Sequence, residues 1–277
     1  MRRPLMALAL SSTLLAGALS AQGVLVAPHV VVIDHQTRGT AITLYNPGAE
    51  PAEVSISGFF GYPITDSIGE FELATPDPAT AGLPSSAGWI DAYPRRVLVG
   101  PLERQTIRLL GRPPANLADG EYWSRLMISA KGGKVAVQSA DSARGIDIGL
   151  DLEVRTIIPV QYRKGSITTG VRIEGVRAEK DGDSLAVRAR MVRQGNAAFV
   201  GTGHLRLRDE SGRLAAEAAI PLAVYVEIDP LMRIATAALP AGRYTLEIEL
   251  VTERTDLPDT QIVPAAPARA SLPIVLE

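Results

Sequence analysis

The chain has 277 residues, a formal net charge of −2 and no cysteine. Without cysteine, disulfides, thiolate chemistry and Cys-ligated zinc are excluded, so packing has to stabilise the fold. Acidic and basic side chains are interspersed, and this pattern gives no electrostatic footprint for nucleic acid or for an anionic membrane.

The first 21 residues predict a secretory signal peptide. Arg2 and Arg3 precede an apolar run, and small residues around Ala21 follow it. We expect the mature chain to begin near Gln22 and to be exported. Later apolar runs fall short of the ~18 residues that a membrane span needs, so no membrane insertion is expected.

The rest of the chain has the texture of β-sandwiches. Short runs rich in Val, Ile, Thr and Tyr recur between turns, as in "TAITLYNPGAEPAEVSISGFF" and "HLRLRDESGRLAAEAAIPL". A polar, Gly-containing segment, "RKGSITTG", precedes a fresh set of strands. We therefore expect two sandwich domains in tandem, at residues 22–164 and 165–277.

One predicted strand is unusually long. In "GIDIGLDLEVRTIIPVQYR", residues 145–163, apolar or β-branched side chains occupy the even positions and polar ones most odd positions up to Arg155. Its first part, residues 145–158, would span about 45 Å, against roughly 17–20 Å for an ordinary strand. Either it faces its own core throughout, or residues 146–152 overhang the domain and face a partner while residues 154–160 stay in the core.

The order of several motifs resembles a known family, the periplasmic chaperones of pilus assembly. The matching pieces are "VAPHVVVIDHQTRGTAITLYNPGAEPAEV", "PRRVLVGPLERQTIRLLGR", "LADGEYWSRLMI" and "IIPVQYR", which cover most of residues 25–163. The second half matches only in size and texture. The resemblance implies an all-β fold class with two immunoglobulin-like β-sandwich domains in tandem. It also implies a binding protein rather than an enzyme, without cofactors.

In such chaperones the last strand of the first domain is lent to a subunit whose own sandwich lacks a strand. The matching positions here are Ile146, Ile148, Leu150, Leu152 and Val154. The implied partners are subunits of a pilus or another secreted assembly, together with an outer-membrane usher. The rival interpretations are a structural or adhesive component of a surface fibre and a carbohydrate-binding sandwich.

The resemblance also places two polar sites at the domain junction. Glu121 and Arg163 match an ion pair that fixes the angle between the domains, and Glu253 and Asp256 are further candidates for that cluster. The family's two basic residues for a subunit carboxylate align with Val30 and Pro159, which cannot bind one. The substitutes considered are Arg155, Lys164, Arg38 and Arg96, although such surface cations are most often only solvated.

Catalytic and metal-binding patterns are poor. The three histidines, His29, His35 and His204, have no companion at ligand spacing, and Ser85, Ser86 and Ser139 lack a nucleophile-elbow motif. Asp147, Asp151 and Glu153 share one strand face, where they either bind a cation or guard the edge against pairing. Residues 74–89 predict an exposed, mobile loop.

Overall fold

The computed structural model describes residues 23–137 and 148–277, and almost all of its regular structure is β-strand. The first domain is a sandwich of two sheets, with a four-stranded and a five-stranded member. The four-stranded sheet contains, in spatial order, β1 (Leu25–Ala27), β3 (Gly39–Tyr45), β9 (Arg104–Gly111) and β7 (Ile90–Tyr93). The five-stranded sheet contains β2 (Val31–Asp34), β11 (Ile148–Lys164), β10 (Gly120–Val137), β4 (Ala52–Phe59) and β8 (Arg96–Val99).

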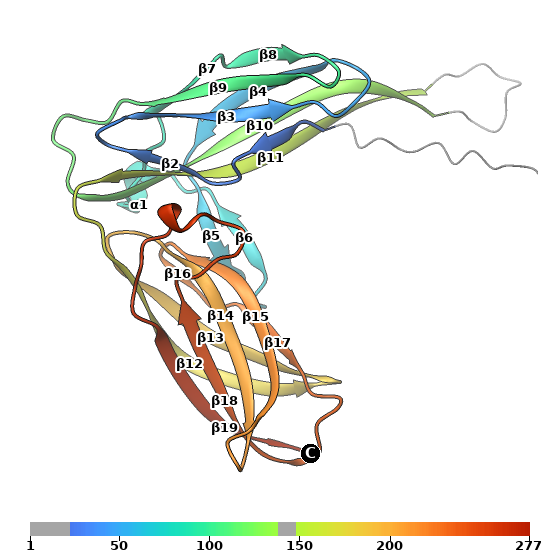
Figure 1. The fold of residues 1–277 in the computed structure, drawn as a ribbon, viewed down its shortest axis with the longest axis vertical. Coiled ribbons are helices and arrows are strands. Elements are labelled where there is room, and N and C mark those ends of the chain that lie inside the picture. The colour runs from blue at the N-terminus through green and yellow to red at the C-terminus, as the bar shows by residue number, and fades with distance from the viewer. Residues whose placement is uncertain (1–22, 138–147) are drawn as a thin grey trace, which may run out of the picture.

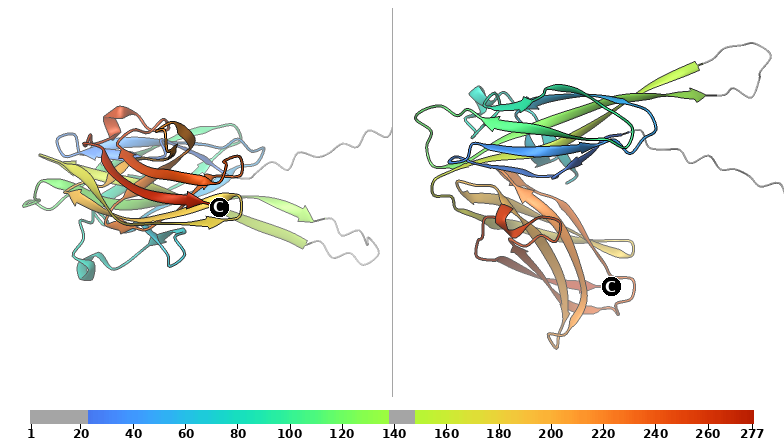
Figure 2. Two further views of the ribbon diagram at one scale, coloured as in Figure 1. Left: turned by 90° about the horizontal axis from the view of Figure 1, so that it is seen from below. Right: turned by 45° about the horizontal axis from the view of Figure 1, so that its top comes forward.

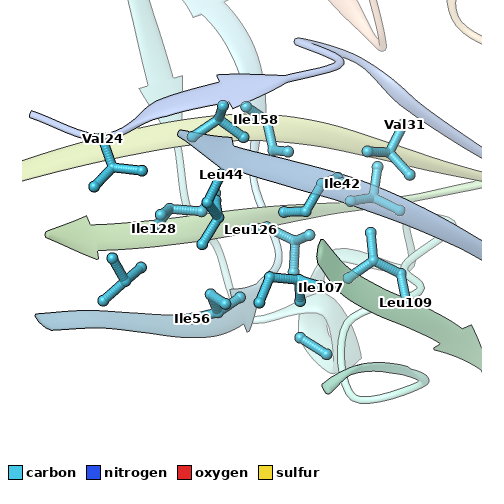
Figure 3. Packing of buried hydrophobic residues seen from close by; sticks show 14 of the residues in the cluster. Val24, Val31, Ile42, Leu44, Ile56, Ile107, Leu109, Leu126, Ile128 and Ile158 are labelled. Carbon is cyan, nitrogen blue, oxygen red and sulfur yellow. The ribbon is translucent and has the colours of Figure 1, made fainter. Parts of the chain in front are cut away.

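This strand order is that of an immunoglobulin-like sandwich, in which the first, second, fifth and fourth strands form one sheet and the third, sixth and seventh the other. Alternate residues of each strand point inward, so that Leu44 and Ile107 of one sheet meet Ile128 and Ile158 of the other (Figure 3). The expected fold class is therefore confirmed for this half of the chain.

The second domain is also a sandwich of antiparallel sheets, and Phe199, Val187 and Leu246 lie fully buried between them. One sheet contains β12 (Thr169–Asp181), β13 (Ser184–Gly195), β16 (Glu227–Ile228) and β17 (Leu231–Ala235), and the other β15 (Leu214–Val224), β14 (Phe199–Asp209), β18 (Gly242–Val251) and β19 (Ala268–Leu276). The connector between β11 and β12 runs from 165 to 168. The division of the chain at residue 164 stays a prediction.

A small hairpin belongs to neither sandwich. Strands β5 (Tyr62–Thr65) and β6 (Phe71–Ala74) pair only with each other among the described residues, and they reach from the first domain toward the second (Figure 1). At the hairpin's turn, the Leu231 amide of the second domain donates a hydrogen bond to the Gly69 carbonyl, 2.9 Å away. No sequence pattern indicated this contact between the domains.

The prediction of an exposed, mobile loop at residues 74–89 is wrong for part of that segment. It contains a short helix, α1 (Pro78–Ala81), and the side chain of Ser86 is fully buried. The pairing of β4 with β10 ends at Arg125 of β10. The backbone of Trp123, two residues earlier in β10, therefore has no partner in β4. The loop fills the place, because Trp123 N donates to Pro84 O at 2.8 Å and Ser86 N donates to Trp123 O at 2.9 Å.

Candidate partner-binding site

One edge of β11 is open along most of the strand. On one side β11 pairs with β10 from Ile148 to Lys164, while on the other side β2 joins it only from Val160 to Arg163. Within the part of the chain that the structure describes, no strand lies beside residues 148–159 on that side. Their outward backbone N–H and C=O groups are therefore available to a further strand.

The β10–β11 hairpin also extends beyond its sandwich (Figures 1 and 2). Strand β4 pairs with β10 only between Arg125 and Lys131. Past a register shift between Lys131 and Lys134, the two strands continue to pair with each other alone, ending with Val137 opposite Ile148. A strand added to β11 would therefore contact a ribbon that stands clear of the domain.

The residues predicted to contact a partner are placed as follows. Ile146 lies outside the described residues, and Ile148 and Leu150 are placed by their backbone positions in β11. Leu152 is 47% exposed. Val154 is half-buried, and a Cβ built on Gly23 would lie 3.4 Å from its Cγ1. Exposure thus decreases toward the core residue Ile158, which is 2% exposed.

The structure brings Glu121 and Arg163 together at the domain junction. Arg163 Nε donates to Glu121 Oε2 at 2.9 Å, and the carboxylate is buried. The other oxygen, Oε1, accepts from Trp123 Nε1 at 2.9 Å and from the amide of Ala198 in the second domain at 3.1 Å. Arg163 Nη2 donates to Gln261 O at 2.7 Å, so that both residues of the pair contact both domains.

The other two candidates for this cluster lie elsewhere. Asp256 pairs with Arg254 at 2.6 Å, and the main-chain carbonyl of Glu253 accepts from the Thr202 hydroxyl at 2.6 Å. The hydrogen bonds between the second domain and the two side chains involve main-chain groups of that domain, the Ala198 amide and the Gln261 carbonyl. Main-chain contacts of this kind leave no side-chain pattern in the sequence.

Beside this cluster is a pocket of about 380 Å³ between the domains. Val30 and Pro159, at the positions where the family resemblance would require basic residues, form part of its wall. Its lining also includes Phe71 and Leu73 of the small hairpin, Ile157 and Gln161 of β11, Val200, Ala223 and Tyr225 of the second domain, and the cations Arg125 and Arg254.

Sequence reasoning missed both cations of this pocket, and Arg125, from the first domain, is the more deeply placed of the two. It is only 8% exposed, its Nε donates to Gly61 O at 3.0 Å, and its guanidinium carbon lies 5.2 Å from the ring centroid of Tyr225. The structure records no ion pair for Arg125 among the described residues. Burial raises the pKa of the Tyr225 phenol, which keeps this neighbour neutral.

A signal for Arg125 did exist in the sequence. Glu121, Trp123 and Arg125 alternate along β10, and their register partners on β11 are Arg163, Gln161 and Pro159. An alternating row that contains a tryptophan and both charges indicates a strand face covered by another domain, but the sequence alone did not say which domain covers it.

The four proposed carboxylate anchors lie outside the pocket. Arg155 forms an ion pair with Glu153 at 3.0 Å. Lys164 donates to the Leu117 carbonyl and lies 3.6 Å from Asp119. Arg38 donates to the carbonyl of His35 at 3.3 Å, and Arg96 is exposed on β8. An anchoring role for any of them stays a prediction.

Within residues 23–137 and 148–277, no three His, Asp or Glu side chains lie together in a group that could hold a metal ion. His35 Nδ1 lies 2.7 Å from the Tyr162 hydroxyl, at the edge of the first domain's core. Asp147 and Ser139 fall outside the described residues, while Trp123 is buried and Trp89 half-buried. The described parts of the chain contain no helix with the length and hydrophobicity to cross a membrane.

Neither the protein-family models nor the curated proteins give a match to this chain. Solved structures do. The YadV chaperone is 13% identical with a TM-score of 0.46, covering 90% of this chain and 99% of its own. The CsuC–CsuE chaperone–tip adhesion subunit complex of Acinetobacter baumannii is 16% identical with a TM-score of 0.46, covering 83% and 92%.

A third match is the Salmonella enterica SafA pilin in complex with the SafB chaperone, 13% identical with a TM-score of 0.44 and coverage of 92% and 99%. All three TM-scores lie below 0.5, so the function of this chain has to be argued from its own residues.

Proposed function

We propose that this protein is a periplasmic chaperone-like protein that binds subunits of a pilus or another secreted assembly by strand addition along β11. The observation that carries the proposal is the open edge of β11 from Ile148 to Pro159. An edge of this length is a hazard, because it can pair with any extended segment, and proteins normally cover or shorten such edges. Its persistence here is explained if a partner strand uses it.

The side chains of the strand support the same proposal. An added strand obtains its hydrogen bonds from the β11 backbone and its specificity from alternate side chains that enter pockets of the partner. Each large aliphatic side chain transferred from water to such a pocket contributes roughly 1.5–3 kcal/mol. The five alternate positions from Ile146 to Val154 would contribute about 7–15 kcal/mol in gross terms, before the costs of association.

The expected location follows from the signal peptide predicted over residues 1–21, and an outer-membrane usher is a further proposed partner. Fractionation of cells that express the full chain tests the location. We expect the processed protein in the osmotic-shock fluid. Retention of the unprocessed chain in the cytoplasm would contradict it.

The binding proposal is tested with the double variant Ile148→Asp, Leu150→Asp and a synthetic probe. The probe is a peptide of about ten residues with alternating Val and Thr, capped at both ends, which matches the length of the open edge. We expect the variant to lose binding by at least about tenfold, since two charges would replace the apolar side chains that the valines of the added strand contact across the ladder. The matched control is Leu98→Asp, an exposed position on β8, which should bind as the unchanged protein does.

Thermal melting of the same variants separates the two interpretations of the strand. Exposed substitutions usually change stability by within about 0.5 kcal/mol, so a partner-facing strand predicts melting close to that of the unchanged protein. If the first domain's transition collapses, the strand serves its own sandwich and the proposal fails. Equal binding of the probe to the variant and to the unchanged protein would also overturn it.

A further inference from the structure

The open edge of β11 ends at a defined place. From Val160 onward β2 occupies that edge, with Val31 opposite Val160. A strand that adds to β11 from Ile148 onward therefore has to leave the sheet when it reaches Ile157–Pro159, because the next backbone groups are already paired. The interdomain pocket lies at this point, since Ile157, Pro159 and Val30, the residue before β2, all belong to its wall.

The β5–β6 hairpin supplies the facing wall. Phe71 and Leu73, two residues apart on β6 and therefore on one face, are 49% and 39% exposed and line the pocket together with Ile157, which is 41% exposed. Large apolar side chains gathered at one opening indicate a surface that a further apolar group covers.

The hairpin is held in position from the second domain. The Leu231 amide donates to Gly69 O at 2.9 Å, the Asp229 amide donates to Thr65 Oγ1 at 2.7 Å, and Arg188 Nη1 donates to Ser67 O at 2.8 Å. These three contacts come from different strands or turns and attach both the tip and the first strand of the hairpin. The β5–β6 hairpin that carries Phe71 and Leu73 is thus attached to the second domain.

We propose that the β5–β6 hairpin is a second partner-binding element, and that its pocket takes one large apolar side chain from the end of the strand that β11 binds. This inference rests on the proposed function. The occupant is the partner's strand because the pocket continues directly from the open edge, and Ile157 belongs to both. The chemistry is apolar because the large exposed side chains of the lining, those of Phe71, Leu73 and Ile157, are apolar.

The test compares two capped peptides of about ten alternating Val and Thr residues, one with Phe at both ends and the other with Ser at both ends. Because both ends are the same, the result does not depend on the direction in which the peptide pairs. We expect the Phe peptide to bind the unchanged protein at least about tenfold more tightly, as is usual when an aromatic side chain is buried.

The same pair of peptides is then measured on the variant Phe71→Ser, Leu73→Ser. Both positions are partly exposed, so melting should stay near that of the unchanged protein, and the preference for Phe should disappear while the Ser peptide binds as before. The control Leu98→Ser removes an exposed leucine on β8, far along the sheet from β11, and should keep the preference.

The outcomes separate the two proposals. If both peptides bind the unchanged protein equally, the pocket does not take the strand's end and this inference is overturned, while binding along β11 stands. A preference for Phe that survives in the hairpin variant, or that the control also loses, overturns it too. If neither peptide binds, the proposed function itself fails.

Discussion

Glu121 and Arg163 face each other across the β10–β11 ladder, with Arg163 Nε 2.9 Å from Glu121 Oε2, at the place where the second domain covers the first. The carboxylate is buried and has three hydrogen-bond donors in all, from Arg163, Trp123 and Ala198. Such a group tolerates burial only while its cation and its donors are present.

Replacing Arg163 by leucine should therefore cost about 3–5 kcal/mol of the free energy of unfolding, because a buried carboxylate would lose its cation. Denaturant unfolding measures the change. The matched control is Arg155→Leu, which breaks the solvent-exposed pair with Glu153 and should cost at most about 1 kcal/mol. Similar losses in the two variants would contradict the structural role assigned to the Arg163 pair.

Ile157 and Ile158 are neighbours in β11 whose side chains differ sharply in burial. Ile158→Ala should destabilise the first domain by about 2–5 kcal/mol, since it leaves a cavity in the core. Ile157→Ala should change stability by less than about 1 kcal/mol, because its side chain lies at the open pocket. Calorimetric melting of both variants checks the register of β11, and a larger loss for Ile157→Ala would show it to be shifted by one residue.

Gly69 holds the tip of the small hairpin against the second domain. Its φ of +92° is unfavourable for other residues, and a Cβ there would lie 2.5 Å from Leu231 N. We expect Gly69→Ala to weaken the bond from the Leu231 amide to the Gly69 carbonyl and to speed hydrogen exchange at that amide.

The control for this prediction is Gly82→Ala. Gly82 also has a positive φ, of 60°, but a Cβ there would meet nothing within 4 Å. The control should leave exchange at the Leu231 amide unchanged. If Gly69→Ala leaves it unchanged as well, the hairpin is not attached through this contact.

Glu249 on β18 predicts a pH dependence for the second domain. Hydrogen bonds from Arg206 first, and then from Arg269, hold the pKa of this carboxyl below its usual range. A depressed pKa in the folded state contributes stability that is present above the unfolded-state pKa, near 4.5, and is lost as the pH falls below that value.

We therefore expect the Glu249→Gln variant to lose less stability than the unchanged protein as the pH falls below about 4.5. Unfolding at a series of pH values measures the difference. The control is Glu217→Gln, whose side chain is mostly exposed and lies 4.0 Å from Arg206. A pH profile of Glu249→Gln that parallels that of the unchanged protein would contradict the prediction.

The sequence by itself determined the elements and their class. Alternation along residues 145–163 predicted a long strand with one apolar face. Strand β11 runs from Ile148 to Lys164, and its inner-face residues Ile158, Val160 and Tyr162 are buried in the core. The order of motifs around Glu121 and Arg163 also brought those two residues to notice, through a resemblance to known proteins.

Only the tertiary structure decided which edge of β11 stays open and what surrounds its end. That outcome depends on where β2 begins, and strand pairing between residues more than a hundred positions apart leaves no local pattern. The same holds for the hairpin, because its attachment joins Gly69 to Leu231 through main-chain groups, which every residue carries. Side-chain patterns determine which face of a strand is apolar, but the packing of distant segments determines which neighbour covers it.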